Sequence, residues 1–108
     1  MSEKTEMQDI AIRILEAHDI EYIHLPNRMF GKYKTPLKLK TLPDLIFTYN
    51  NKFYMREFGI HGRHEDRKRE QWERMQKWKR QADSNTDIAM IWSRAELEDD
   101  FRRIGLLV

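Results

Sequence analysis

Apolar residues recur at two different spacings along the chain, and these spacings predict helices and strands separately. Residues 5–18 predict an amphipathic helix, because one face carries at helical spacing Met7, Ile10, Ala11, Ile14 and Leu15. A second helix is predicted over residues 65–82. A third begins after the capping box Ser93-x-x-Glu96 and runs through Arg103, with Gly105 past its end. Alternating apolar residues at 20–25 and 87–92 predict two short strands.

Residues 43–59 predict a β-hairpin. Two runs rich in β-branched and aromatic residues flank Asn50-Asn51, a pair that tolerates the positive φ angles of a two-residue turn. With this turn the register places Asp44 directly opposite Glu57. Two carboxylates side by side on antiparallel strands destabilise the pair unless a cation lies between them.

A divalent metal is the natural candidate for that cation, because Mg²⁺ prefers oxygen ligands and commonly takes one or two carboxylates with water and phosphate. The alternative is that the hairpin ends before position 44, so that Asp44 only caps a turn after Pro43. The spacing of the residues leaves both interpretations open.

Both faces of the hairpin are apolar, which decides the fold class. Ile46, Phe53 and Met55 share the carboxylate face, and the other face carries Leu45, Phe47, Tyr49 and Tyr54. A sheet that is apolar on both faces needs a layer on each side. We therefore predict one α/β domain spanning residues 1–108, a three-layer α/β/α sandwich with the element order αβββαβα.

The arrangement of these motifs resembles the PD-(D/E)XK nuclease superfamily, and in detail its small phage-type VRR-NUC domains. The resemblance covers most of the chain, and its motifs are Ile23-His24-Leu25-Pro26-Asn27-Arg28, Leu42-Pro43-Asp44-Leu45-Ile46, Glu57 and a following helix with Gln71. It implies a restriction-endonuclease-like fold with a central mixed sheet. One position departs from the family: its Glu-x-Lys pattern puts a lysine at position 59, where this chain has Gly59.

The resemblance implies a Mg²⁺- or Mn²⁺-dependent DNA endonuclease of phage or mobile-element type. Asp44 and Glu57 would bind the metal together with the Phe58 carbonyl oxygen. Gln71 matches the family's active-site glutamine, and the acidic residue expected early on the first helix is Glu6, with Glu3 as the fallback.

Position 59 also lies on the same strand face as Glu57, since residues two apart on a strand share a face. We therefore expect that glycine leaves space there and that a lysine would stand beside Glu57; alternatively, Gly59 marks a bend or bulge. A replacement cation is expected from His61 or Arg63, because the register puts the other basic candidates, Lys52 and Arg56, on the opposite face.

Gly59 also favours a second hypothesis, a catalytically impaired nuclease-fold module that binds nucleic acid or a protein partner, for instance a phage-encoded inhibitor or accessory factor. The argument against it is the retained carboxylate pair, which a module without catalysis has no need to keep.

The charge of the chain bears on the class of partner that it can bind. The net charge of +2 gives no polycation argument for nucleic acid, but the segment 28–40 holds five basic residues and no acid. We expect DNA, with branched, flap or single-stranded regions, to contact Arg28, Lys32, Lys34, Lys38, Lys40 and Arg63; the alternative is a solvated loop. The resemblance also implies a homodimer that reaches two strands.

The chain has no cysteine, which excludes disulfides and thiolate metal sites. Neither a signal peptide nor an apolar run of membrane-spanning length is visible. We therefore expect a cytoplasmic protein without a membrane partner.

Overall fold

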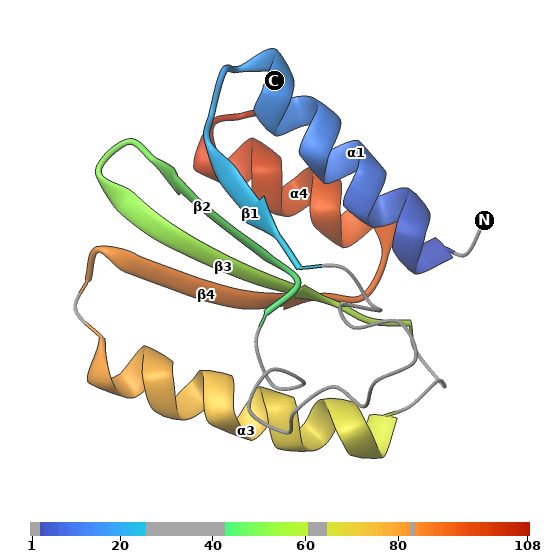
Figure 1. Cartoon of the computed structure of the whole chain (residues 1–108), viewed down its shortest axis with the longest axis vertical. Coiled ribbons are helices and arrows are strands. Elements are labelled where there is room, and N and C mark those ends of the chain that lie inside the picture. The colour runs from blue at the N-terminus through green and yellow to red at the C-terminus, as the bar shows by residue number, and fades with distance from the viewer. Residues whose placement is uncertain (1–2, 26–42, 61–64, 83) are drawn as a thin grey trace.

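A computed structural model describes residues 3–25, 43–60, 65–82 and 84–108, except for the side chains of residues 65–68 and 70. The elements follow one another as α1 (Glu3–Ala17), β1 (Tyr22–His24), β2 (Leu45–Tyr49), β3 (Lys52–Phe58), α3 (Glu65–Gln81), β4 (Thr86–Ile91) and α4 (Arg94–Ile104) (Figure 1). This is the predicted order αβββαβα.

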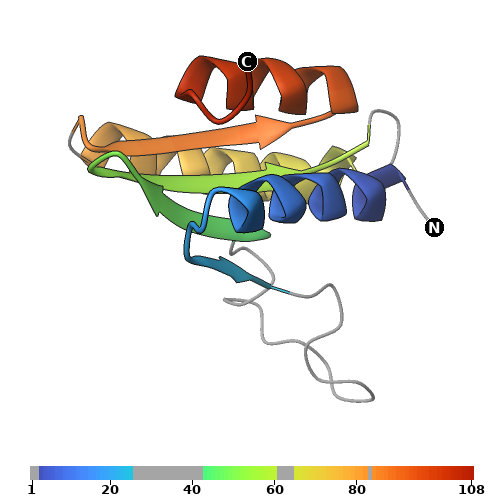
Figure 2. The same cartoon turned by 90° about the horizontal axis from the view of Figure 1, so that it is seen from above.

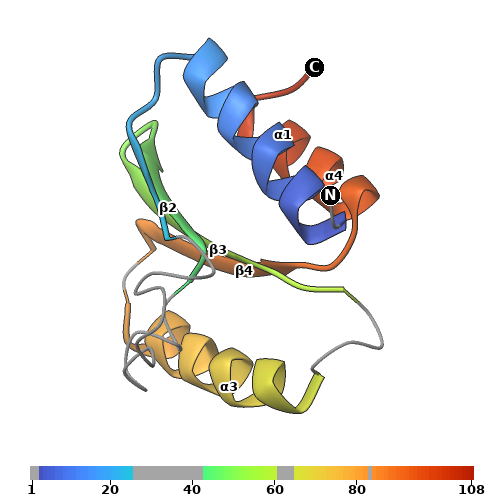
Figure 3. The ribbon, with the colours of Figure 1, turned by 45° about the vertical axis from the view of Figure 1, so that its right-hand side comes forward.

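The strands form one four-stranded sheet in the order β1-β2-β3-β4, which Figure 2 shows from above. β1 and β2 are antiparallel, as are β2 and β3, whereas β3 and β4 are parallel, so the sheet is mixed. Helices α1 and α4 lie on one face of the sheet and α3 lies on the other (Figure 3). The predicted three-layer α/β arrangement is therefore confirmed.

The β2–β3 hairpin has the predicted turn and register. Asn50 and Asn51 have φ angles of 53° and 66°, and the preferred two-residue hairpin turn needs positive φ at both positions. Ile46 pairs with Met55 across the two strands, as this turn requires. The register carries the carboxylate pair to the end of the hairpin that lies away from the turn.

The main core lies between the sheet and the α1/α4 layer. Phe47 of β2 stacks on Tyr54 of β3 with ring centroids 4.9 Å apart, and Phe101 of α4 meets Phe47 edge-on at 5.9 Å. A fully buried Leu, Ile, Phe or Met side chain contributes about 1.5–3 kcal/mol. The other buried residues of this cluster are Met7, Ala11, Leu15, Leu45, Phe58, Ile91, Leu97 and Leu106. This core packs α1 and α4 against the β2–β3 hairpin, at whose end the carboxylates lie.

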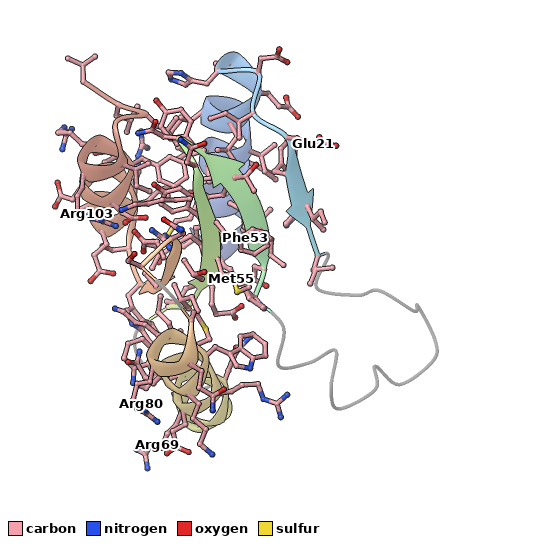
Figure 4. All side chains as sticks on the ribbon, turned by 90° about the vertical axis from the view of Figure 1, so that its left-hand side faces the viewer. Glu21, Phe53, Met55, Arg69, Arg80 and Arg103 are labelled. Carbon is pink, nitrogen blue, oxygen red and sulfur yellow. The ribbon has the colours of Figure 1, made fainter. Side chains whose placement is uncertain are left out.

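The opposite face is only partly covered. Met75 of α3 and Ile88 of β4 are fully buried there, as expected for a helix that packs mainly on β4. Phe53 stays 40% exposed, and Figure 4 shows it with Met55 on the strand. The carboxylate face of the hairpin is thus apolar as predicted but more open than the α1/α4 face.

The predicted caps of the last helix are present. The Ser93 side chain accepts a hydrogen bond from the amide of Glu96 at 3.2 Å, and Gly105 after the helix has a left-handed φ of 106°. The Glu96 carboxylate in turn accepts from the amide of Trp92 at 2.6 Å. These caps fix the start of α4 directly beside the end of β4.

Candidate functional site

Two carboxylates meet at the end of the β2–β3 hairpin. Asp44 is 8% exposed and Glu57 is 1% exposed. The amide of Asp44 donates to Oε1 of Glu57, and the amide of Phe58 donates to Oδ2 of Asp44, both at 3.0 Å. The last paired residues of the ladder are Leu45 and Arg56, so the hairpin ends before position 44, as the alternative expected. The two hydrogen bonds nevertheless bring the Asp44 and Glu57 side chains together across the strands, as the register predicted.

A lysine completes this pair. Nζ of Lys4, in the first turn of α1, lies 3.3 Å from Oδ2 of Asp44 and 4.0 Å from Oε2 of Glu57. The Lys4 side chain is 22% exposed, whereas the Glu57 side chain is 2% exposed. The cation that the facing carboxylates require is therefore an ammonium group supplied by the first helix.

Further polar side chains lie beside this group. Gln8 is one helical turn after Lys4 and is 3% exposed, with Oε1 3.3 Å from Nε2 of His24 on β1. Within the described part of the chain, Nε2 of Gln8 is buried without a hydrogen-bond partner. The interior wall next to the carboxylate pair is therefore polar.

Gln71, the predicted active-site glutamine, is buried. It is 6% exposed and lies one turn before Met75, on the side of α3 that faces the sheet. Met75 packs against the sheet face that also carries Glu57 by strand alternation. Gln71 thus belongs to the layer that covers the carboxylate face.

Glu6 and Glu3 lie where α1 meets the start of α4. Both line a separate cavity of about 130 Å³, whose other lining residues are Met7, Ile10, Trp92, Ser93 and Arg94. The helical turn directs Glu6 toward α4, and Lys4, two residues earlier, points to the carboxylates. Lys4 thus contacts the pair from α1, and a role of Glu6 or Glu3 at the metal stays a prediction.

Position 59 has no room for a side chain. A Cβ atom on Gly59 would lie 2.6 Å from Cζ3 and 2.9 Å from Cε3 of the Trp92 indole. The Gly59 amide also donates to the Ile91 carbonyl at 2.9 Å, which continues the β3–β4 pairing. The expectation that glycine leaves free space here is wrong, because the indole occupies that space.

Arg56 is a structural residue of the α1/α4 face, as the register predicted. Its side chain is fully buried and all five of its N–H donors are used. Nε and Nη2 donate to the Asp100 carboxylate, Nη2 also donates to Oδ1 of Asp87, and Nη1 donates to the carbonyls of Met55 and Asp87. This network joins β3, β4 and α4.

The ionisation of Asp87 depends on that network. Burial of the Asp87 carboxyl opposes its ionisation, but the charges and hydrogen bonds of Arg56 and Arg103 outweigh burial and hold its pKa below the ordinary value. Nη2 of Arg103 donates to Oδ2 of Asp87 at 3.1 Å. The carboxylate is therefore charged at neutral pH and part of the fold.

The predicted DNA-binding residues and His61 lie outside the described residues. The predicted DNA-binding residues are Arg28, Lys32, Lys34, Lys38, Lys40 and Arg63. The described surface offers another basic region on α3, where four exposed basic side chains are Arg69, Lys77, Lys79 and Arg80. Figure 4 shows Arg69 and Arg80 directed away from the sheet.

Two features of the described residues concern metal binding and the membrane. No group of three or more His, Cys, Asp or Glu side chains able to hold a metal occurs among them, so Asp44 and Glu57 stand as a pair. None of the described helices is long and apolar enough to cross a membrane.

Comparisons of the chain with models of protein families, with curated proteins and with solved structures find no match. No relative therefore supplies a function for the chain.

Proposed function

We propose that the protein is a Mg²⁺- or Mn²⁺-dependent phosphodiesterase that cleaves DNA. The observation that supports this most is the pair Asp44 and Glu57, two nearly buried carboxylates that backbone amides hold face to face at the end of a hairpin. Burying two like charges side by side is costly unless the site has a cationic occupant. Lys4 supplies a single positive charge to two carboxylates, so the pair can still attract a further cation.

The donor atoms at the pair suit a hard divalent cation. Both side chains offer oxygen, and Mg²⁺ typically takes one or two carboxylates, with water and substrate phosphate completing its ligands. Oδ2 of Asp44 accepts the hydrogen bond from the Phe58 amide and forms the ion pair with Lys4. Oδ1 takes no part in these two contacts. A bound divalent cation supplies Lewis-acid activation of the phosphate and of the attacking water.

The residues of the chain have separate tasks in this proposal. Asp44 and Glu57 hold the cation, and the Phe58 carbonyl adds an oxygen. Gln71 lines the site from α3. Lys4 supplies the positive charge that related enzymes carry at the position of Gly59, and one such electrostatic group commonly contributes about 10²–10³ in rate.

The basic surface of α3 supports a polyanionic substrate. Residues 74–80 include Arg74, Lys77, Lys79 and Arg80 and no acid, and lysine and arginine side chains bind phosphate backbones with little sequence preference. Trp72 on the same helix is 42% exposed, and its indole offers a stacking surface for an unpaired base. We further propose that the DNA substrate is branched, flapped or single-stranded and that the protein acts in the cytoplasm as a homodimer.

Calorimetric titration with MnCl₂ tests the proposal directly. The parent protein is expected to bind Mn²⁺, and Asp44→Asn is expected to abolish binding. Asp99→Asn serves as the control, because the Asp99 side chain is 79% exposed and far less engaged. Plasmid, flap and junction DNA are then incubated with Mn²⁺ and the parent, the Asp44→Asn variant or the Asp99→Asn control. Cleavage of DNA by the Asp44→Asn variant would refute the assignment of the site.

A second candidate is a nuclease-fold module without catalysis. Two observations favour it: the Lys4 ammonium already neutralises part of the charge of the pair, and the Trp92 ring fills the position of the family lysine. This module would bind DNA or a protein partner but would neither bind Mn²⁺ at Asp44 nor cleave any of the substrates. The same titration therefore separates the two candidates.

A further inference from the structure

Lys4 occupies a position where a basic residue is electrostatically unfavourable. The first turn of α1 also contains Glu3 and Glu6, and acidic residues are stabilising there because the helix N-terminus carries partial positive charge. A lysine in this turn adds like charge to that end of the helix. The contact of Lys4 with Asp44 and Glu57 offsets this unfavourable interaction with the helix N-terminus.

The carboxylate pair needs the charge of Lys4. The amides of Asp44 and Phe58 each give a hydrogen bond to the pair but carry no net charge. The ammonium group lies within 4.0 Å of an oxygen of each carboxylate. It therefore offsets the repulsion between two groups that are nearly excluded from water.

We propose that Lys4 and a divalent cation are alternative occupants of this pair, an inference that rests on the proposed metal-dependent function. An ammonium and a divalent cation held by the same two carboxylates would repel each other strongly in a site of low water content. Metal binding therefore displaces Nζ of Lys4 from Asp44. The long, partly exposed side chain then presents its charge at the rim of the site, where it pairs with a phosphate oxygen of the substrate.

In the metal-free protein, the Lys4 side chain therefore competes with the metal for the carboxylate pair. Lys4 stabilises the fold while the metal is absent and lowers the affinity for the metal by the free energy needed to displace it. Removing its charge should act in opposite directions on these two properties. A lysine with only a structural role would affect the first property alone.

The test compares Mn²⁺ titrations of the full chain carrying Lys4→Met, Lys4→Arg and, as a control on the same helix, Arg13→Met. Methionine keeps most of the apolar length of lysine and removes the charge. We expect Lys4→Met to bind Mn²⁺ about tenfold more tightly than the parent, within the usual range for coupled binding. Lys4→Arg and Arg13→Met should stay close to the parent.

Thermal melting supplies the second measurement. Lys4→Met should melt below the parent without metal, and saturating Mn²⁺ should raise its melting temperature more than that of the parent. If Lys4→Met is too unstable for calorimetry, this difference in the effect of Mn²⁺ decides the question.

The possible results distinguish competition by Lys4 from metal binding at the carboxylate pair. A parent protein that binds Mn²⁺ while Lys4→Met binds it equally or more weakly would overturn the competition and leave the metal site standing. Absence of Mn²⁺ binding by both proteins would overturn the metal site and the inference together. Binding by Lys4→Met alone would support the inference and identify Lys4 as a block on the parent site.

Discussion

The amide of Asp44 donates to Oε1 of Glu57 at 3.0 Å, so a side chain of β3 fixes the backbone that leads into β2. Glu57 therefore has a structural task besides its proposed task at the metal. The two tasks need different properties of the side chain: an oxygen acceptor for the first and a negative charge for the second.

Replacing Glu57 in two ways should separate these tasks. Glu57→Ala removes the acceptor of a buried amide and should lower the free energy of unfolding by about 1–3 kcal/mol. Glu57→Gln keeps an oxygen acceptor and should unfold close to the parent, yet it should lose Mn²⁺ binding. Urea unfolding without metal measures the first effect, with Glu98→Ala on the surface of α4 as the control. Equal destabilisation by both variants would contradict a structural role for the acceptor oxygen.

Arg56 should be among the most sensitive positions in the chain. Arg56→Met leaves the carboxylates of Asp87 and Asp100 without their buried partner and should cost about 3–5 kcal/mol of unfolding free energy. Arg56→Lys should also be strongly destabilising, because an ammonium cannot reproduce the five directed donors of a guanidinium. Arg94→Met is the matched control, since the Arg94 side chain is 70% exposed. An Arg56→Met protein as stable as the control would show that the network contributes little.

The stability of the protein should fall in acid partly through Asp87. Its pKa is lowered in the folded protein by Arg56 and Arg103 despite burial, whereas the unfolded chain has the ordinary value of about 3.9. The stabilisation is therefore complete above that ordinary value and is lost as the pH falls through the lower, folded pKa. Urea unfolding between neutral pH and acid should show a shallower pH dependence for Asp87→Asn than for the parent. Parallel curves would exclude Asp87 as a source of acid sensitivity.

Substitution of Gly59 by a larger residue should lower the stability of the fold, whatever its effect on catalysis. Gly59→Lys forces the Trp92 ring to move, and such overpacking typically costs about 1–3 kcal/mol. Gly59→Lys combined with Trp92→Ala should lose less stability than the two single effects added together, because the second change removes the clash. Melting temperatures of the four proteins in this cycle measure the coupling. Strict additivity would mean that the indole is not the obstacle.

The basic side chains of α3 should contribute to DNA binding. Replacing Lys77, Lys79 and Arg80 by Gln should weaken binding and reduce the salt slope, log Kobs against log salt, by up to about 2.7, since each phosphate that a cation neutralises adds about 0.9 to the slope. Arg13→Gln, on a helix of the opposite layer, controls for the loss of one positive charge elsewhere on the surface. Fluorescence anisotropy over a range of salt concentrations gives the slopes. An unchanged slope would assign the α3 residues to solubility.

The sequence allowed the hairpin to be predicted in detail because its determinants are local. Asn50 and Asn51 define the turn, and strand alternation then brings Asp44 opposite Glu57 without knowledge of the remaining chain. The same locality explains why the caps at Ser93 and Gly105 were predicted correctly.

Residues whose roles depend on packing between distant elements were missed. Lys4 reaches the carboxylates only because α1 packs against β3. Its one sequence signal is a basic residue between two acids in a first helical turn. The partners of Arg56 come from β4 and α4, and an arginine in a strand carries no mark that it is buried. The indole over Gly59 likewise comes from the residue after β4.

The network around Arg56 also has a consequence for the order in which the chain acquires its structure during synthesis. Arg56 precedes Asp87 by 31 residues and Asp100 by 44 residues. A nascent chain can therefore close the β2–β3 turn while this guanidinium still needs water as its partner. The core face of β3 becomes dry only when the last helix has emerged. A ribosome that stalls before residue 100 would leave a hairpin with a hydrated arginine and an uncovered apolar face, a form open to proteases that remove unfinished chains.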